Sequence, residues 1–355
     1  MLIYVMQDAS GLWDVVDVFQ SVIWNMQFYG PSEFELVVPA TKKNVDILKK
    51  GYYLVREEDT KSANEYHNVM RIEGINLSYQ VEEGWILTVT GHGLKNILSQ
   101  RIIWSQTNLS GSVEKGIRKV ITENVISPKD TRRAIPNFSM EAGNGFPDKF
   151  EAQLLGENLS EWMETTCKAY GMGWDVYIKN GGFVFSLKKG TDRSADQNQV
   201  IPVIFSPEYD NLITSDYSYD LGEFKNAALV GGEGEGADQR TASVGTATGL
   251  GRYETFIDGS SVSSNGEIIT LSQYIKLLEN YGKEQIDQTF TVEKTEGTVI
   301  PNGMYDLGVD YFLGDLVQIK NDFIEAKTRV IEIIYSEDEN GWALTPTFSS
   351  WEEDE

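Results

Sequence analysis

Residues 69–90 of this chain read VMRIEGINLSYQVEEGWILTVT, and residues 327–348 read KTRVIEIIYSEDENGWALTPTF. In both stretches apolar and polar residues tend to alternate on either side of a short acidic turn that ends in Gly-Trp. Such alternation predicts a half-buried β-strand, and two strands around a short turn predict a β-hairpin. The chain is therefore expected to contain two similar β-hairpins, far apart in the sequence.

The two hairpins belong to a wider internal repeat. Three pairs of segments match: Ile72-Glu73 with Ile331-Glu332 and Tyr52–Leu54 with Tyr311–Leu313, both at an offset of 259 residues, and Gly84-Trp85 with Gly341-Trp342 at 257. The difference of two residues equals the period of a strand, so each strand keeps the same face toward the core. The repeat predicts that one β domain occurs twice per chain. Chance similarity between short β segments is the alternative.

The repeat divides the chain into three predicted regions. Residues 1–98 form a first β domain, residues 99–210 an α+β insertion, and residues 211–355 a second β domain with one long helix. Apolar residues at helical spacing predict helices near 113–121, 159–170 and 271–288. We therefore expect a mainly β protein with an α+β insertion.

Shorter patterns predict the remaining elements. A short helix is expected at 43–50, and residues 127–150 and 231–251 are expected to be loops. Asn180-Gly181 between two alternating runs predicts a tight hairpin turn. Further strands are expected near 22–28, 34–38, 52–56, 174–178, 183–187, 200–205, 212–219, 226–231, 252–258, 290–296 and 315–320.

The charge of the chain disfavours several partners. With 54 acidic and 30 basic residues, the formal net charge is −24. Such a surface repels nucleic-acid phosphates and anionic membranes. Because no apolar segment has the length of a membrane span or the form of a secretory signal, we expect a chain that is made and folded in the cytoplasm, with no membrane span.

The familiar catalytic motifs are missing from the sequence. It has no Gly-x-Ser-x-Gly elbow and no phosphate-binding loop that ends in Gly-Lys-Ser/Thr. His67 and His92 are the only histidines and Cys167 is the only cysteine, which is too few for a zinc site of the usual kind. Neither histidine has the context of a catalytic triad, and Cys167 is predicted to be a small core residue.

The acidic clusters also have ordinary interpretations. Glu57-Glu58-Asp59 and Glu337-Asp338-Glu339 fall at predicted turns, where solvated charge is expected, and Asp338–Gly341 is read as a hairpin turn and not as a calcium loop. Gly232–Gly236 is predicted to be a flexible acidic loop. We therefore assign no catalytic, cofactor-binding or metal-binding residue and expect no enzyme, although a pair of carboxylates could still form a glycosidase site.

Several longer stretches resemble one family of proteins. These are Trp24 through Leu36, Gly51–Val55, Ile103–Gly111, Lys189–Ser194, Phe205–Leu212, Gly232–Gly236 and Gly341 through Phe348. Taken together and in this order, they resemble the tail-tip (baseplate) hub proteins of siphophages and prophages. The N-terminal module of tail-associated lysins is similar to the same family. The resemblance covers nearly the whole chain.

The resemblance implies a structural role in a virion. It implies a homotrimer in which two β-barrel-like hub domains per chain form a pseudo-six-fold ring around the DNA channel. The implied partners are the hexameric distal tail protein, the tape measure protein and separate tail fibre, receptor-binding or tip proteins. DNA would pass through the channel without specific binding, and the hub would be assembled in the cytoplasm of the bacterial host.

Two other functions stay open at this point. The chain could be a tail module that binds glycans of the host surface, or a carboxylate-based cell-wall hydrolase. Many relatives continue into a hydrolase or adhesin region, whereas this sequence stops at Glu355, after the second β domain. We therefore expect fibres, receptor-binding proteins and any cell-wall hydrolase to be separate chains.

Overall fold

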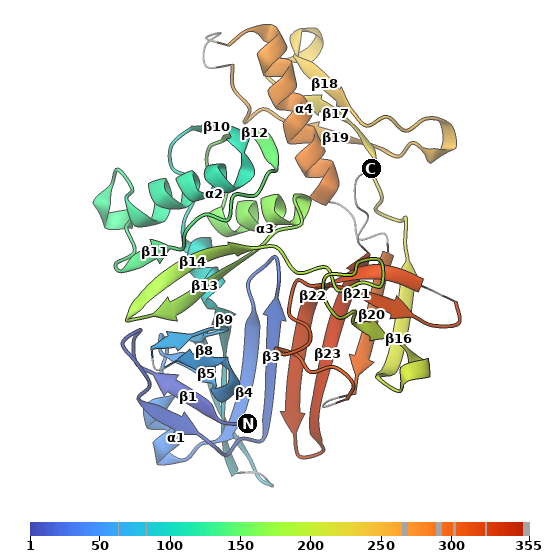
Figure 1. Cartoon of the computed structure of the whole chain (residues 1–355). Coiled ribbons are helices and arrows are strands. Elements are labelled where there is room, and N and C mark those ends of the chain that lie inside the picture. The colour runs from blue at the N-terminus through green and yellow to red at the C-terminus, as the bar shows by residue number, and fades with distance from the viewer. Residues whose placement is uncertain are drawn as a thin grey trace.

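A single large β-sheet connects the two ends of the chain. The computed structural model describes residues 1–62, 64–82, 84–264, 269–288, 293–300, 303–323 and 325–350. Thirteen strands form the sheet, in the order β16-β20-β23-β22-β3-β4-β9-β8-β5-β1-β2, and β21 pairs with β22 and with β15 (Figure 1). Their bounds are β1 Ile3–Met6, β2 Asp14–Val16, β3 Ser21–Gln27, β4 Glu33–Pro39, β5 Tyr53–Arg56, β8 Met70–Gln80, β9 Gly84–Gly93, β15 Ile204–Phe205, β16 Leu212–Tyr219, β20 Glu293–Val299, β21 Leu316–Lys320, β22 Glu325–Asp338 and β23 Gly341–Ser350.

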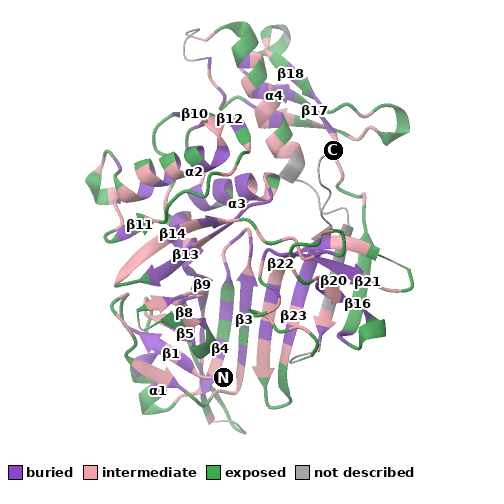
Figure 2. Ribbon diagram, in the orientation of Figure 1, coloured by how far each residue is buried: buried purple, intermediate pink, exposed green. Residues whose placement is uncertain are grey.

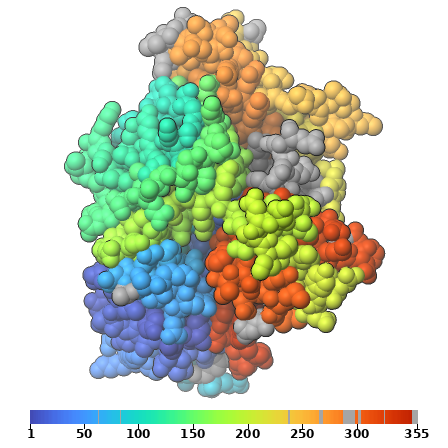
Figure 3. Space-filling view, viewed as in Figure 1, coloured from blue at the N-terminus to red at the C-terminus, as the bar shows by residue number. Residues whose placement is uncertain are grey.

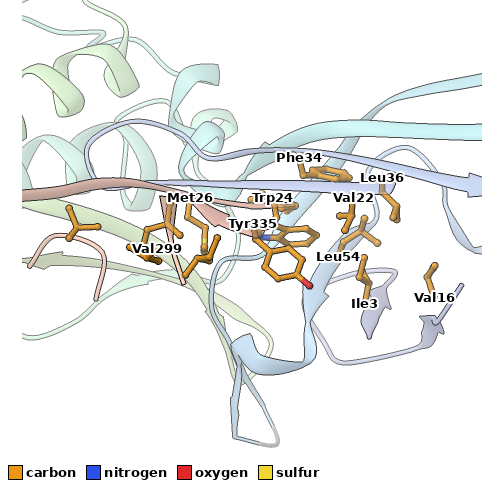
Figure 4. Packing of buried hydrophobic residues seen from close by; sticks show 14 of the residues in the cluster. Ile3, Val16, Val22, Trp24, Met26, Phe34, Leu36, Leu54, Val299 and Tyr335 are labelled. Atoms are coloured by element: carbon orange, nitrogen blue, oxygen red, sulfur yellow. The ribbon is translucent and has the colours of Figure 1, made fainter. Parts of the chain in front are cut away.

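The alternation in the sequence determines which face of this sheet is buried. Trp24, Phe34, Leu36 and Tyr335 occupy alternate positions on neighbouring strands, and all are buried in one apolar cluster (Figure 4). Figure 2 shows buried positions along β3, β4 and β22. Because this cluster contains residues from both ends of the chain, the two ends fold against one core.

The middle of the chain forms a second core above the first sheet. It contains α2 (Val113–Ile121), α3 (Leu159–Ala169), the pair β10 (Thr107–Ser112) and β12 (Lys149–Leu154), and a second sheet. That sheet consists of β6 (Thr60–Ser62), β7 (Glu65–Tyr66), β11 (Phe138–Met140), β13 (Gly173–Lys179) and β14 (Gly182–Lys188). Asn158 caps α3 by accepting hydrogen bonds from the Ser160 and Glu161 amides, and Gly171 follows the helix with a φ of 57°.

A third, smaller core lies at the far end of the molecule. The strands β17 (Ala227–Gly231), β18 (Thr241–Val244) and β19 (Glu254–Asp258) form a sheet that packs against α4 (Leu271–Gln288) (Figure 1). In sequence this segment lies between β16 and β20. The structure therefore has a second inserted unit, in addition to the one that follows β9.

Phe28 lies where the first strands, the middle unit and the C-terminal strands meet. Its ring is fully buried at the end of β3, and a Cβ on Gly173 or on Gly314 would lie 2.1 Å from the ring. The charged ends of Lys188 and Arg329 lie over the ring, 5.9 and 5.6 Å from its centroid. Phe28 thus connects the first strands, the middle unit and the C-terminal strands. Figure 3 shows the surfaces of these three parts of the chain adjoining one another.

Most of the predicted elements are present. The short helix is α1 (Lys42–Ile47), and the helix expected at 271–288 is α4. Asn180 and Gly181 both have positive φ, as the hairpin turn requires. The expected loops were wrong in part, because β11 lies within 127–150 and β18 within 231–251. The prediction of a strand near 290–296 lies partly outside the described residues.

Candidate assembly interface

Two sets of five strands have the same order in the sequence and in the sheet. The first strand set consists of β3, β4, β5, β8 and β9, and the second strand set of β16, β20, β21, β22 and β23. Within the first set β3 pairs with β4, β4 with β9, β9 with β8 and β8 with β5. Within the second set β16 pairs with β20, β20 with β23, β23 with β22 and β22 with β21. The two sets therefore have the same topology.

The hairpins of the two sets also have the same bulge. In the first set the register shifts between Ile72 and Gly74, where Ile72 pairs with Gly91. In the second set it shifts between Val330 and Glu332, where Val330 pairs with Phe348. One extra residue in the long strand is a β-bulge, which increases the local twist of the strand. From the positions of the bulges, Ile72 corresponds to Val330 and Gly91 corresponds to Phe348.

Two glycines before the shorter strands make the same backbone hydrogen bond in both sets. The Gly51 amide donates to the Ile72 carbonyl at 2.7 Å, and the Gly314 amide donates to the Val330 carbonyl at 2.8 Å. Both glycines have positive φ, of 87° and 98°. The hydrogen bond before the shorter strand therefore occupies the same place in the two sets.

These registers correct the sequence alignment of the repeat. The bulges place Val330 opposite Phe348 as Ile72 is placed opposite Gly91, so the long strands correspond at an offset of 258 residues and not 259. Gly51 corresponds to Gly314, which means that the match of Tyr52–Leu54 with Tyr311–Leu313 was wrong. The cause is physical: the bulges and turn lengths shift the register in ways that residue matching does not show.

The two strand sets meet where β22 pairs with β3. Tyr335 pairs with Trp24, and the guanidinium of the buried Arg56 lies 5.8 Å from the Trp24 ring and 5.7 Å from the Tyr335 ring. Arg56 is held by Asp59, whose Oδ2 lies 2.6 Å from its Nε. Burial, together with the nearby Glu337 carboxylate, raises the pKa of Tyr335. The buried side of this junction is thus well packed and fully hydrogen-bonded at Arg56 and Asp59.

The opposite side of the junction is polar. The Glu332 carboxylate accepts hydrogen bonds from Asn25 Nδ2 at 2.9 Å, from Thr347 Oγ1 at 2.7 Å and from the Gln27 side chain. Glu33 and Glu35 are exposed on the same face of β4. One face of the large sheet is therefore apolar and buried, while the other is polar and acidic near the junction.

The two histidines lie in different sheets. His67 follows β7, stacks on Tyr177 with 4.4 Å between the ring centroids, and lies 3.1 Å from Glu65. Burial would lower the pKa of His67, but Asp175 and Glu65 raise it above its usual value. His92 is part of β9, with its Nδ1 2.7 Å from Glu73. The structure does not bring the two histidines together in one site.

Cys167 is fully buried on α3, as predicted, and burial raises the pKa of its thiol. No three His, Cys, Asp or Glu residues of the described chain are grouped so that they could hold a metal ion. No helix among these residues is long and apolar enough to cross a membrane.

Two predictions about acidic residues were wrong. Asp59 is buried and paired with Arg56, and is not a solvated turn residue. Glu233 is fixed, because its carboxylate accepts from the Ser264 amide at 2.7 Å and pairs with Arg240. A Cβ on Gly232 would lie 2.3 Å from the Tyr274 hydroxyl, so this segment packs against α4. The pattern of glycines and acids could not reveal these partners, which are distant in sequence.

A cleft of about 280 Å³ lies between β12, α3 and α4. Its lining includes Trp162, Tyr281, Glu157 and Glu284. Trp162 Nε1 and Glu157 Oε2 are buried without a hydrogen-bond partner in the described structure, and burial raises the pKa of Glu157. The cleft is therefore lined by polar as well as aromatic residues.

The fold is that of prophage tail proteins. The structure is similar to the tail protein from Neisseria meningitidis MC58 (TM-score 0.59, 13% identity, 98% of this chain and 96% of that chain). It is also similar to the 43 kDa tail protein of prophage MuSo2 from Shewanella oneidensis (0.58, 14%, 98% and 98%) and to prophage tail protein gp18 from Listeria monocytogenes EGD-e (0.53, 12%, 99% and 95%).

The chain belongs to the family of Siphovirus ReqiPepy6 Gp37-like proteins, because the family model matches residues 2–348. The resemblance to siphophage and prophage tail proteins is therefore confirmed, and the chain is a structural protein of a phage or prophage tail. A comparison with curated proteins found no match.

Proposed function

We propose that three copies of the chain form a structural ring at the tip of a phage-like tail. In this proposal the two strand sets are the cores of two similar β-barrel-like hub domains, within residues 1–98 and 211–355, and residues 99–210 are an insertion. The observation that carries the proposal is the shared strand order, bulge and hydrogen-bond register of the two sets. Three chains would then present six similar domains and match a six-fold partner.

We propose the partners that the family resemblance implies, and a six-fold partner is compatible with the proposed ring. The ring would join the hexameric distal tail protein and the tape measure protein to separate tail fibre, receptor-binding or tip proteins, within the tail tip of the virion. It would be assembled in the cytoplasm of the bacterial host. The role is structural and not enzymatic.

The polar face of the sheet would line the channel. Glu33 and Glu35 are exposed on this face, and the net charge of the chain is −24. Such a wall repels phosphates, so DNA would pass without specific binding.

Mass measurement of the purified chain tests the proposal. We expect light scattering to give the mass of three chains for the chain alone, or of three chains plus one distal tail hexamer after it is mixed with the distal tail protein of the same phage. A chain that stays monomeric in both conditions, at concentrations well above micromolar, would contradict the ring.

The cleft favours a second candidate function, which is binding of a neutral host-surface saccharide. The half-buried Tyr281 provides aromatic surface, and polar side chains such as Gln153 and Glu161 line the cleft beside it. A glycan array with the intact chain tests this function. Binding that is lost in Tyr281→Ala and kept in Trp104→Ala, which changes an exposed tryptophan outside the cleft, would support it. Hydrolysis of purified cell wall would instead support the carboxylate-based hydrolase.

A further inference from the structure

The strand β22 pairs with two different strands, one after the other, along the same edge. Residues Glu325–Arg329 of β22 pair with β21 of their own strand set. Residues Glu332–Glu337 pair with β3, which belongs to the other set. The second half of β22 therefore pairs with β23 of its own set on one side and forms the junction with the other set on the other side.

The corresponding half of β8 has no such neighbour in the described structure. Met70 and Arg71 pair with β5, as the first half of β22 pairs with β21. Beyond the bulge, Gly74–Gln80 pairs with β9 on one side, and no described strand pairs with it on the other side. The second half of β8 is thus an open edge of the sheet.

Apolar side chains on this edge of β8 are more exposed than the corresponding side chains of β22. Ile333 and Tyr335 in β22 are 1% and 9% exposed, because β3 adjoins them. Their counterparts in β8 at the 258-residue offset are Ile75 and Leu77, which are 46% and 49% exposed. Apolar side chains on an open strand edge favour pairing with a further strand.

The strand that corresponds to β3 lies at the opposite end of the sheet. This strand is β16, which pairs with β20 and lies at one end of the sheet order. Tyr217 is opposite Thr295 as Trp24 is opposite Phe34, so Tyr217 corresponds to Trp24. Trp24 is fully buried, whereas Tyr217 is 42% exposed.

We propose that the open half of β8 in one chain pairs with β16 of the next chain, antiparallel and in the register that β22 and β3 have within each chain. This inference rests on the proposed function, because it specifies how the copies of the ring are joined. Tyr335 pairs with Trp24 and Ser336 with Ile23. Leu77 would therefore lie opposite Tyr217 of the next chain, and Ser78 opposite Asp216.

The proposed contact is heterologous, since two different edges meet. A contact of this kind makes a closed ring if its rotation closes and a filament if it does not. Because the junction within the chain and the junction between chains would have the same geometry, the strand sets would follow one another at equal steps. Pairing would also cover both exposed apolar edges.

Disulfide trapping tests the register. Ser78→Cys with Asp216→Cys places two thiols on the polar face of the proposed junction, and the natural Cys167 is buried. Ser336→Cys with Ile23→Cys is the corresponding pair within one chain and serves as the positive control. Ser78→Cys with Ser218→Cys keeps the face but moves one thiol by two residues, beyond disulfide distance.

We expect covalent dimers and trimers from the Ser78/Asp216 pair on a denaturing gel and at least tenfold less from the Ser78/Ser218 pair. A three-chain assembly in which the Ser78/Asp216 pair does not react, while the positive control does, would overturn this inference and leave the ring intact. If the unmodified chain stays monomeric with its distal tail protein, both proposals fail.

A charge at the edge provides an independent test. Leu77→Lys should prevent assembly, because the ammonium group would have to be buried opposite Tyr217. Val45→Lys, at a similarly exposed position on α1, should assemble normally. Both variants should have the circular dichroism spectrum of the natural chain. Normal assembly of Leu77→Lys would contradict the pairing.

Discussion

At the scale of single residues, Phe28 packs between the parts of the chain and stabilises their arrangement. We expect Phe28→Ala to lower the free energy of unfolding by about 3–5 kcal/mol, because the glycines on both sides of the ring cannot fill the cavity. Phe323→Ala, at an exposed position, should change it by less than about 0.5 kcal/mol. Urea unfolding of both variants checks this, and equal losses would contradict the role of Phe28.

Lys95 makes stability depend on pH. Burial lowers its pKa to about 7, although its ammonium donates to the Gln27 and Phe28 carbonyls at 2.7 and 2.9 Å. Between pH 7 and the ordinary lysine pKa near 10.5, the unfolded chain binds more protons at this residue than the folded chain does. The contribution of Lys95 to the free energy of unfolding should therefore rise with pH, by up to about 1.4 kcal/mol per pH unit.

Lys95→Met isolates this contribution. Unfolding of the natural chain and of the variant, measured from pH 6 to pH 10, should differ in slope across the window from 7 to 10.5. The variant should lack the rise that Lys95 contributes, whatever its stability at pH 7. Parallel curves would show that Lys95 does not titrate as its burial implies.

At the scale of elements, the glycine before β21 tests the packing of the second strand set against Phe28. Gly314 has a φ of 98°, and a Cβ there would lie 2.1 Å from the Phe28 ring. Gly308 has a φ of 84° with open space around it. We expect Gly314→Ala to be at least about 2 kcal/mol more destabilising than Gly308→Ala, because strain is common to both and overlap is not. Similar thermal unfolding of the two variants would contradict this.

The sequence predicted elements wherever periodicity was long and regular. The hairpins of β8–β9 and β22–β23 alternate over most of their length, and α4 has apolar residues at helical spacing. It did not predict β18, because Thr241–Val244 is short and lies between glycine-rich segments. Bulges are backbone features without a residue signature. The 258-residue offset between the two long strands could therefore not be predicted from the sequence.

The sequence also did not predict that the second half of β8 is an open strand edge. Ile75 and Leu77 alternate like the residues of any half-buried strand, and nothing in their pattern distinguishes them from Ile333 and Tyr335. Only the pairing of β22 with β3, which joins residues some 300 positions apart, shows that β8 lacks the corresponding neighbour. A local pattern indicates that a face is apolar but not what covers it.

At the scale of the whole molecule, the acidic face should keep DNA from binding. The assembled natural chain should not retain DNA at physiological salt, whereas Glu33→Lys with Glu35→Lys should retain it, because the repulsive wall would become attractive. Glu123→Lys with Glu208→Lys changes the net charge equally at exposed positions outside this face. Equal retention by both double variants in a gel-shift assay would show that net charge alone matters.

The central claim is that each chain contributes two similar β domains to one ring. An averaged electron-microscopy view of the purified assembly down its axis tests this claim most directly. The account predicts a ring of three chains in which six similar β domains alternate around one channel, with strands continuous across every boundary. A ring with another number of chains, or one in which the two strand sets lie at different radii, would contradict it.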